Sequence, residues 1–365
     1  MQPSQTYLRF EPTMEIPEPD EAETAAGLVE TMRGICETTF KDGGHAIRSV
    51  HAKSHGLLKG TLSVRTDLPS HLSQGIFAKG GARPVVMRFS TTPGDILDDS
   101  VSTPRGLAIK VLDVEGERLP GSDSRSQDFL FVNGPAFQAR TAKDFLKSLK
   151  LLAATTDKAP GLKKVASALL RAAEASLGSV GGESATLKAL GGHPETNILG
   201  ETYFTQVPLL YGPYIAKLSL APVSPELISL KDAALDLDGR PNGIRDAVVD
   251  FFHAHAGEWE LRVQLCTDLE NMPIEDSSKP WPEGKSPYVP VARMKVERQE
   301  GWSETRSTAI DDGFSFSPWH GIAAHRPLGS IMRVRKAAYE MSARFRSERN
   351  ATPVSEPNAI EEVPA

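Results

Sequence analysis

Short apolar runs separated by turn residues fill residues 48–135 and constrain the fold more than any other feature of this chain. The runs are rich in Val, Ile, Leu and Phe, with Pro, Gly and Asp between them, a pattern typical of consecutive antiparallel strands. The runs are RSVHAKSHGLLKGTLSV (48–64), RPVVMRFST (83–91), RGLAIKVLDV (105–114) and QDFLFVNGP (127–135). Similar runs predict further strands at 201–223, 258–269 and 286–296. The sequence therefore predicts a β-meander that resumes in the second half of the chain.

Helical patterns lie before, between and after these strands. Apolar residues at helical spacing, with suitable residues at the ends, predict helices at 20–40, within 142–192, at 242–257 and at about 328–348. Strands, then helices, then strands again predict an α+β protein whose antiparallel barrel is closed or nearly closed, with the helices on one side. We expect an N-terminal arm and first helix (1–40), a barrel domain (41–348) and a polar, disordered tail (349–365).

Composition excludes several classes of protein. The formal net charge of −6 gives no indication of electrostatic attraction to nucleic acid. The only two cysteines, Cys36 and Cys266, do not form a disulfide framework or a CxxC metal site. The N-terminus lacks the basic and apolar regions of a signal peptide, and no window approaches 18 apolar residues, so we expect a cytoplasmic protein that is not inserted in a membrane. The absence of GxGxxG, Walker, GxSxG and HExxH motifs removes support for nucleotide, serine-hydrolase and zincin chemistry.

Histidine and arginine residues within the strands are the first candidates for a site. His45, His51 and His55 fit no common zinc template, and a strand histidine that is simply hydrogen-bonded is the ordinary interpretation. Arg88 lies in an apolar strand, where a buried guanidinium needs an anionic partner from the protein or from a ligand. Asn133 precedes Gly-Pro and by itself indicates a turn.

The last predicted helix contains RKAAYEMSARFR (335–346). At about 100° per residue, Arg335, Tyr339 and Arg346 fall within roughly 40° of one another on the helix surface. An amphipathic surface helix, with its Tyr beside solvated charges, is the ordinary interpretation of such a stripe.

Together these segments resemble the haem catalase family. RSVHAK resembles the strand that carries the family's distal His, RFST and PRGLAIKV resemble the next two core strands, and VNGPAF resembles the segment with a distal amide and a Phe. RKAAY, with Arg346 seven residues after its Tyr, resembles the family's proximal Arg-x-x-x-Tyr and propionate-binding Arg. Order and rough spacing agree over residues 48–346. The chain has no room for the larger wrapping region or a flavodoxin-like domain, so the resemblance is best to short, minimal catalase-like proteins.

The resemblance implies a catalase-like, eight-stranded antiparallel barrel that binds haem b. Tyr339 would be the proximal iron ligand with Arg335 beside it, and His51 would be the distal acid and base, with Ser90 and Asn133 as further catalytic residues. The other residues implied to bind the haem are Arg48, Val50, Arg88, Phe137, Phe145 and Arg346.

Elementary chemistry agrees with these roles. A tyrosine with an ordinary pKa of about 10 needs a positive neighbour as well as iron to bind as a phenolate, and Arg335 lies one helical turn away. Seven residues of helix rise roughly 10 Å, which suits the distance from iron to propionate. A histidine can take a proton from bound peroxide and return it to the leaving oxygen.

One departure from the family concerns the distal amide. Alignment on Pro135 and Phe137 puts Val132 at the amide position, so either Asn133 substitutes through a shifted turn or the amide is absent. The predicted function is a haem-dependent hydroperoxidase that reduces H₂O₂ or organic hydroperoxides with an unknown electron donor. The alternatives are a lipid-hydroperoxide isomerase or dehydratase and a haem-binding or sensor protein without turnover. We expect no NADPH, and a homo-oligomer stays open.

Overall fold

The computed structural model describes residues 6–155 and 193–364. The part of the predicted helical region that spans 156–192 lies outside the described residues. The nine strands are β1 (Ser54–Val64), β2 (Gly81–Thr91), β3 (Arg105–Val111), β4 (Gln127–Val132), β5 (Tyr203–Phe204), β6 (Leu209–Tyr211), β7 (Tyr214–Pro222), β8 (Gly257–Leu265) and β9 (Val289–Val296). Each predicted strand region contains at least one of them.

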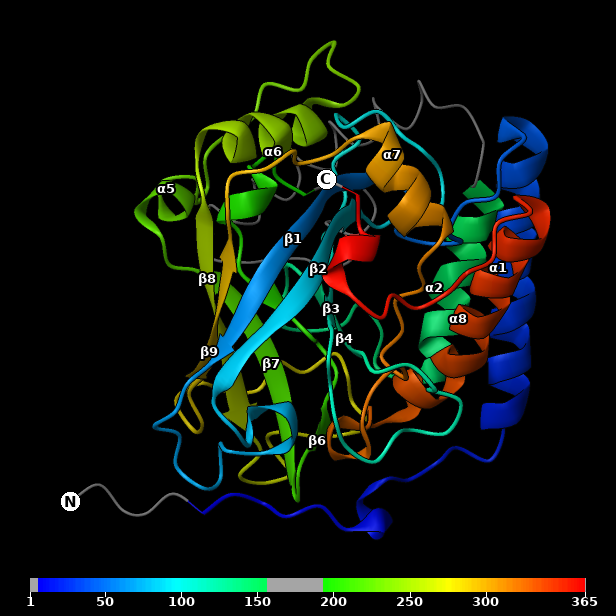
Figure 1. Ribbon diagram of the computed structural model, residues 1–365. Coiled ribbons are helices and arrows are strands. Elements are labelled where there is room, and N and C mark those ends of the chain that lie inside the picture. Colours follow the sequence, from blue (N-terminus) through cyan, green and yellow to red (C-terminus); the bar gives the residue numbers. More distant parts are fainter. Residues whose placement is uncertain (1–5, 156–192, 365) are drawn as a thin grey trace, which may run out of the picture.

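The strands form a closed antiparallel barrel (Figure 1). Their order is β5-β4-β3-β2-β1-β9-β8-β7-β6, and a further pairing of β5 with β7 closes a ring of eight strands with β6 on its edge. The pairing β1–β9 aligns Thr61 with Lys295, so the barrel joins the two halves of the chain. The predicted α+β class with an eight-stranded barrel is confirmed.

Alternation along β2, β3 and β4 explains why these strands are apolar throughout. Odd-numbered residues such as Val85, Met87 and Phe89 pack in the main core inside the barrel. Successive side chains of a strand point to opposite faces, so the even-numbered Arg88 and Ser90 lie on the outer face of the barrel. This outer face is covered by other parts of the chain instead of by water, so it too is largely apolar.

Helices cover that outer face. Figure 1 shows α1 (Glu21–Gly43), α2 (Ala142–Thr155) and α8 (Ser330–Arg349) side by side at one flank of the barrel, and they share a core of their own. The other helices within the described residues are α5 (Pro225–Ile228), α6 (Gly243–Ala254) and α7 (Glu304–Ser307). The remaining short turns are η1 (Pro12–Met14), η2 (Gly75–Phe77), η4 (Ile198–Gly200), η6 (Ala323–His325), η7 (Ile360–Glu362) and the π-helical η5 (Thr308–Asp312).

The C-terminal segment, predicted from its composition to be a disordered tail, lies on the barrel. Val363 is buried with Leu57 and Val86 on the outer face of β1 and β2. Glu356 forms an ion pair with the fully buried Lys110, which also binds Asp128 at 2.7 Å. The sequence of this segment is polar and contains Pro. Two contacts nevertheless hold the segment on the barrel: the buried side chain of Val363, and the carboxylate of Glu356, which pairs with the buried ammonium of Lys110.

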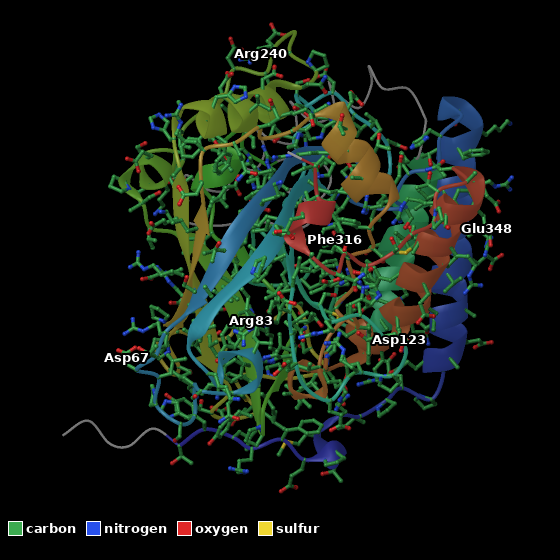
Figure 2. All side chains as sticks on the ribbon, in the orientation of Figure 1. Asp67, Arg83, Asp123, Arg240, Phe316 and Glu348 are labelled. Carbon is green, nitrogen blue, oxygen red and sulfur yellow. The ribbon has the colours of Figure 1, made fainter. Side chains whose placement is uncertain are left out.

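The surface is charged and the interior is apolar. Asp67, Arg240 and Glu348 extend into solvent at the periphery, whereas Phe316 is buried between the barrel and the helices (Figure 2). Among the described residues, no helix is both long enough and apolar enough to cross a membrane.

Candidate functional site

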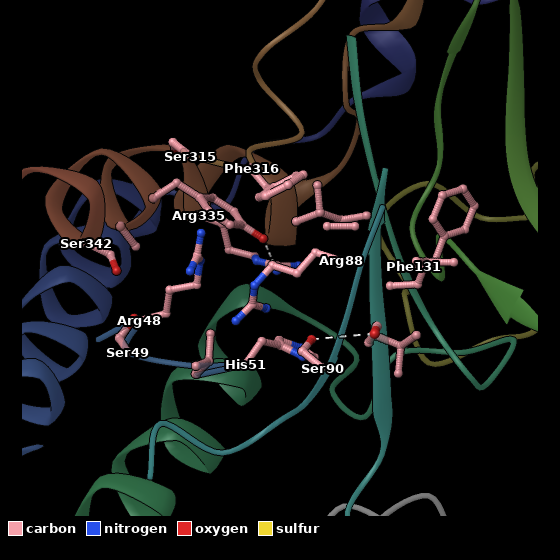
Figure 3. Close-up of a pocket in the computed structure, with 18 of the residues that line it drawn as sticks. Arg48, Ser49, His51, Arg88, Ser90, Phe131, Ser315, Phe316, Arg335 and Ser342 are labelled. Atoms are coloured by element: carbon pink, nitrogen blue, oxygen red, sulfur yellow. Dashed lines mark hydrogen bonds between the residues drawn. The ribbon is translucent and has the colours of Figure 1, made fainter. Parts of the chain in front are cut away.

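A cavity lies between the outer face of the barrel and α8, with an empty volume of about 1030 Å³ that includes its mouth. One wall comes from β2, β3 and β4 and from residues 48–51 before β1, and the opposite wall comes from α8. Nine of the eleven residues predicted from the sequence line it: Arg48, Val50, His51, Arg88, Ser90, Phe137, Arg335, Tyr339 and Arg346. Figure 3 shows Arg48, Arg88, Arg335, His51 and Ser90 converging on the same space.

The α8 side, which we call the helix wall, consists of Arg335, Tyr339 and Arg346. Their spacing places them on one face of the helix, as predicted. The Nη2 of Arg335 donates a hydrogen bond to the phenol oxygen of Tyr339. Burial raises the pKa of Tyr339 above its usual value of 10, although Arg335 acts in the opposite direction. The phenol therefore stays protonated at neutral pH unless a further positive charge, such as a metal ion, binds to it.

The opposite side, which we call the strand wall, consists of His51, Ser90 and Gly106. His51 has a φ of 53°, a left-handed conformation that is uncommon for a residue other than glycine, and its backbone N–H donates to the carbonyl of Thr92 at 2.7 Å. Its Nδ1 lies 3.2 Å from the Oγ of Ser90, which in turn donates to the carbonyl of Gly106 at 3.5 Å. A Ser90 hydroxyl that donates to that carbonyl accepts from Nδ1, and this tautomer leaves Nε2 as the acceptor.

His51 is held as a neutral base. Burial lowers the pKa of His51 to about 3, and the positive charges of Arg88, Arg335 and Arg48 add to the effect. The imidazole is therefore unprotonated over the whole physiological range.

Gly106 is required for this arrangement. A Cβ on Gly106 would lie 2.4 Å from the Nδ1 of His51 and 3.0 Å from the Oγ of Ser90. No side chain other than hydrogen fits between the strand and the imidazole, so the strand wall depends on β3 as well as on the two residues that hydrogen-bond.

Three arginines line one part of the cavity. Arg48 and Arg88 both bind the carboxylate of Asp311, at 3.1 and 2.6 Å. Arg346 donates to the carbonyls of Ser342 and Phe314, and its Nε is buried without a hydrogen-bond partner. Burial lowers the pKa of Arg346 to about 10, and Arg88 contributes to the shift. This group of guanidiniums is suited to a ligand with carboxylates.

Two predicted residues lie outside the cavity. Phe145 packs behind Phe137, with ring centroids 5.1 Å apart. The side chain of Asn133 is turned away: its Oδ1 accepts from the backbone of Arg105 at 2.8 Å, and its Nδ2 binds His193 and Glu201. Val132 lines the cavity instead, because alternation along β4 points residue 132 outward and the chain bends away after it. The prediction that Asn133 supplies a distal amide is not supported by this placement.

Asp311 and Gln206 are the site residues that sequence reasoning missed. The apolar strand around Arg88 indicated an anionic partner, but Asp311 is 223 positions away among many acidic residues. Gln206 lines the cavity with a φ of 60°, and its amide donates to the carbonyls of Gly134 and Ala136 at 3.0 and 2.6 Å. Nothing in the local sequence marks either residue.

Other polar clusters have ordinary explanations. His55 is buried, lies outside the cavity and pairs with the hydroxyl of Thr91 at 3.1 Å. Asp128, His320 and Glu356 are the one group of possible metal ligands among residues 6–155 and 193–364, and the ammonium of Lys110 lies among their carboxylates. These are buried ion pairs of the barrel, consistent with the absence of a zinc motif.

The cavity suits a haem. Tyr339 supplies an oxygen ligand with a guanidinium beside it, the arginines supply partners for carboxylates, and the orphaned Nε of Arg346 is a buried donor in need of an acceptor. Leu130, Phe137, Phe316 and Met332 add apolar surface for a flat macrocycle.

Comparison with known structures agrees with the observed fold. A fungal catalase (1.9 Å) is 17% identical over 99% of this chain and 72% of its own, with a TM-score of 0.60. A bacterial catalase is 16% identical (98% and 68%, TM-score 0.58), and catalase A from Saccharomyces cerevisiae is 15% identical (98% and 72%, TM-score 0.56). No family model matches the sequence. The chain therefore has a catalase-like fold, spread over nearly its whole length, as the resemblance in the sequence predicted.

Proposed function

We propose that this protein is a haem-dependent hydroperoxidase. The proposal rests on one observation: a single cavity brings together the Arg335–Tyr339 pair, the His51–Ser90 pair and three arginines. Each group matches a different need of the reaction.

Tyr339 would hold the iron, and Arg335 would stabilise the phenolate by donating to its oxygen. Arg48, Arg88 and Arg346 would hold the two propionates of haem b. The haem supplies the iron that binds the peroxide and takes up its oxidising equivalents.

His51 moves the proton. Its Nε2, free to accept because Nδ1 is bonded to Ser90, takes a proton from the hydroperoxide. The same nitrogen then returns the proton to the leaving oxygen, which departs as water or as an alcohol. The low pKa of His51 favours the second transfer, because the imidazolium is a strong acid in this site.

The substrate class we favour is organic hydroperoxides. Val132, Val50 and Phe137 give the cavity apolar contacts for an alkyl chain, and Val132 stands where the family resemblance leads us to expect an amide. An apolar wall of this kind also supports the second candidate, a lipid-hydroperoxide isomerase or dehydratase.

Reconstitution with haem b followed by absorption spectroscopy tests the proposal. A Soret band at one haem per chain, and consumption of cumene hydroperoxide together with a phenolic donor, are expected. Turnover without consumption of the donor would favour the isomerase. Full haem loading with no turnover of H₂O₂ or organic hydroperoxides would leave a haem-binding or sensor protein, and the absence of haem binding would refute the proposal.

A further inference from the structure

The turn that follows α7 is built from hydrogen-bond acceptors that face the arginines of the cavity. Arg48 donates to the backbone carbonyls of Ile310, Asp311 and Phe314, at 3.1, 2.7 and 3.1 Å. Arg346 donates to the carbonyl of Phe314 at 3.0 Å. The segment includes the π-helical turn Thr308–Asp312, a local irregularity of a kind that is frequent at functional sites.

The carboxylate of Asp311 is the centre of this segment. Its Oδ1 accepts from the Nε of Arg88 at 2.6 Å and from the Nη1 of Arg48 at 3.1 Å. Its Oδ2 accepts from the hydroxyls of Ser54 and Ser307, at 2.7 and 2.9 Å. Four donors from four different segments therefore fix both oxygens. Asp311 does not itself line the cavity, so it contacts Arg48 and Arg88 on the side that faces away from the cavity.

Charge explains why such a residue is needed. Arg48, Arg88 and Arg346 are buried close enough to repel one another, and burial together with this repulsion lowers the pKa of Arg48 well below its usual value. Burial opposes ionisation of Asp311, but Arg88 and Arg48, with the Ser54 hydroxyl, outweigh burial and hold the pKa of Asp311 at about 2. Three guanidiniums and one carboxylate leave two positive charges, which is the number that the two propionates of haem b neutralise.

We propose that Asp311 is the positioning residue of the propionate side of this site: it fixes Arg48 and Arg88 for two carboxylates and balances their charge before the porphyrin binds. The proposal rests on the haem function proposed above for the identity of the ligand. The arrangement of Asp311 and the arginines stands without it, so the two can be tested separately.

The first experiment measures the thermal stability of the haem-free protein. Asp311→Asn removes a charge that binds the arginines directly. Asp312→Asn is the matched control, because it removes a neighbouring charge that pairs with the exposed His45 at 3.0 Å and acts on Arg48 and Arg346 only through space. We expect Asp311→Asn to lower the melting temperature at pH 7 clearly more than the control. A carboxyl whose folded pKa is lowered stabilises the fold above about pH 4, and the contribution is lost as the pH falls towards 2. The difference between wild type and Asp311→Asn should therefore shrink over that range, and equal melting temperatures for both variants at pH 7 would overturn the proposal.

The second experiment compares the affinity of the protein for haem b with its affinity for haem b dimethyl ester, which lacks free carboxylates. Wild type should prefer haem b. In Asp311→Asn we expect this preference to fall by about tenfold, the typical effect of one hydrogen bond between charged groups. A role in folding alone would lower both affinities equally, and an unchanged preference would therefore refute the positioning role.

Asp311→Glu provides a variant that keeps the charge if Asp311→Asn does not fold. The longer side chain displaces the carboxylate from the two arginines, so the preference for haem b over its ester should still fall. A preference equal to that of wild type would contradict the proposal. If wild type itself binds neither porphyrin, the haem function fails, whereas the melting-temperature comparison still decides what Asp311 does for the arginines.

Discussion

The helix wall and the strand wall of the cavity are built by opposite means. The helix wall takes Arg335, Tyr339 and Arg346 from twelve consecutive residues of α8, and a regular helix is sufficient to align them. The strand wall takes His51, Ser90 and Gly106 from three separate segments, and it needs the β2–β3 register and one left-handed residue. The helix wall therefore depends on one continuous stretch of sequence, whereas the strand wall depends on contacts between distant segments and on one residue in a left-handed conformation. Substitutions in the two walls should therefore have different effects on haem binding and on catalysis.

The largest effect is expected from a substitution in the helix wall, and it concerns haem affinity. Tyr339→Phe removes the proposed iron ligand. Haem affinity should therefore fall by more than about a hundredfold, because losing a residue that only hydrogen-bonds to a metal ligand already costs up to that much metal affinity. Haem titration followed at the Soret band measures it. The matched control is Tyr211→Phe, which removes the hydroxyl of another buried tyrosine that donates to the carbonyl of Leu72 at 2.6 Å. Equal haem affinity of the two variants would show that the helix wall does not bind iron.

His51→Ala tests the strand wall alone. We expect haem binding to persist and the rate of hydroperoxide reduction to fall by roughly 10²–10⁴-fold, the usual contribution of a general acid and base. Stopped-flow measurement of the reaction with cumene hydroperoxide separates the two properties. His253→Ala, an exposed histidine paired with Glu300, serves as the control. A loss of haem in His51→Ala would contradict the prediction that the strand wall serves catalysis and not haem binding.

Gly106→Ala should have an intermediate effect. The added methyl group would push the imidazole away from Ser90, and a displacement of about 1 Å can cost up to about 10²-fold in rate. Haem affinity should change little, because the helix wall is untouched. Gly34→Ala in α1, where a Cβ meets nothing within 4 Å, is the control. Full activity of Gly106→Ala would mean that the position of His51 is not critical.

Val132→Asn is expected to have the smallest effect on the reaction rate, and it should raise the rate instead of lowering it. It places an amide on the cavity wall, where a donor can stabilise developing negative charge on the peroxide. One such donor contributes at most about 10²–10³-fold to kcat when the site is preorganised around it. The Asn at position 132 has no surrounding residues that orient its amide, so it should raise the turnover of H₂O₂ by about tenfold or less. Initial rates with H₂O₂ and cumene hydroperoxide measure the change. A decrease for both substrates would indicate that Val132 serves packing alone.

The contrast between the walls also explains how far the sequence could be interpreted. Helical periodicity needs only neighbours in the chain, so the face shared by Arg335, Tyr339 and Arg346 was predictable from their spacing. His51 and Ser90 were identified through resemblance, because strand residues far apart in sequence give no sign of which ones meet.

The residues that were misjudged depend on tertiary contacts. Asn133 turns toward Arg105 and His193, and only the bend after β4 determines which of two adjacent residues faces the cavity. Asp311 is fixed by Arg48 and Arg88, which are more than 200 positions away. The contacts of the C-terminal segment, a single buried Val363 and one ion pair, leave little trace in composition.

The pairing of β1 with β9 has a consequence for the order of events during synthesis. It joins residues 61–64 to 292–295, and loops of this length close slowly compared with local contacts. The strand wall begins at His51 and the helix wall ends at Arg346, so the ribosome must synthesise almost all of the sequence before the two can face each other. Truncated products, even those that contain every strand of the barrel, are therefore unable to form the pocket.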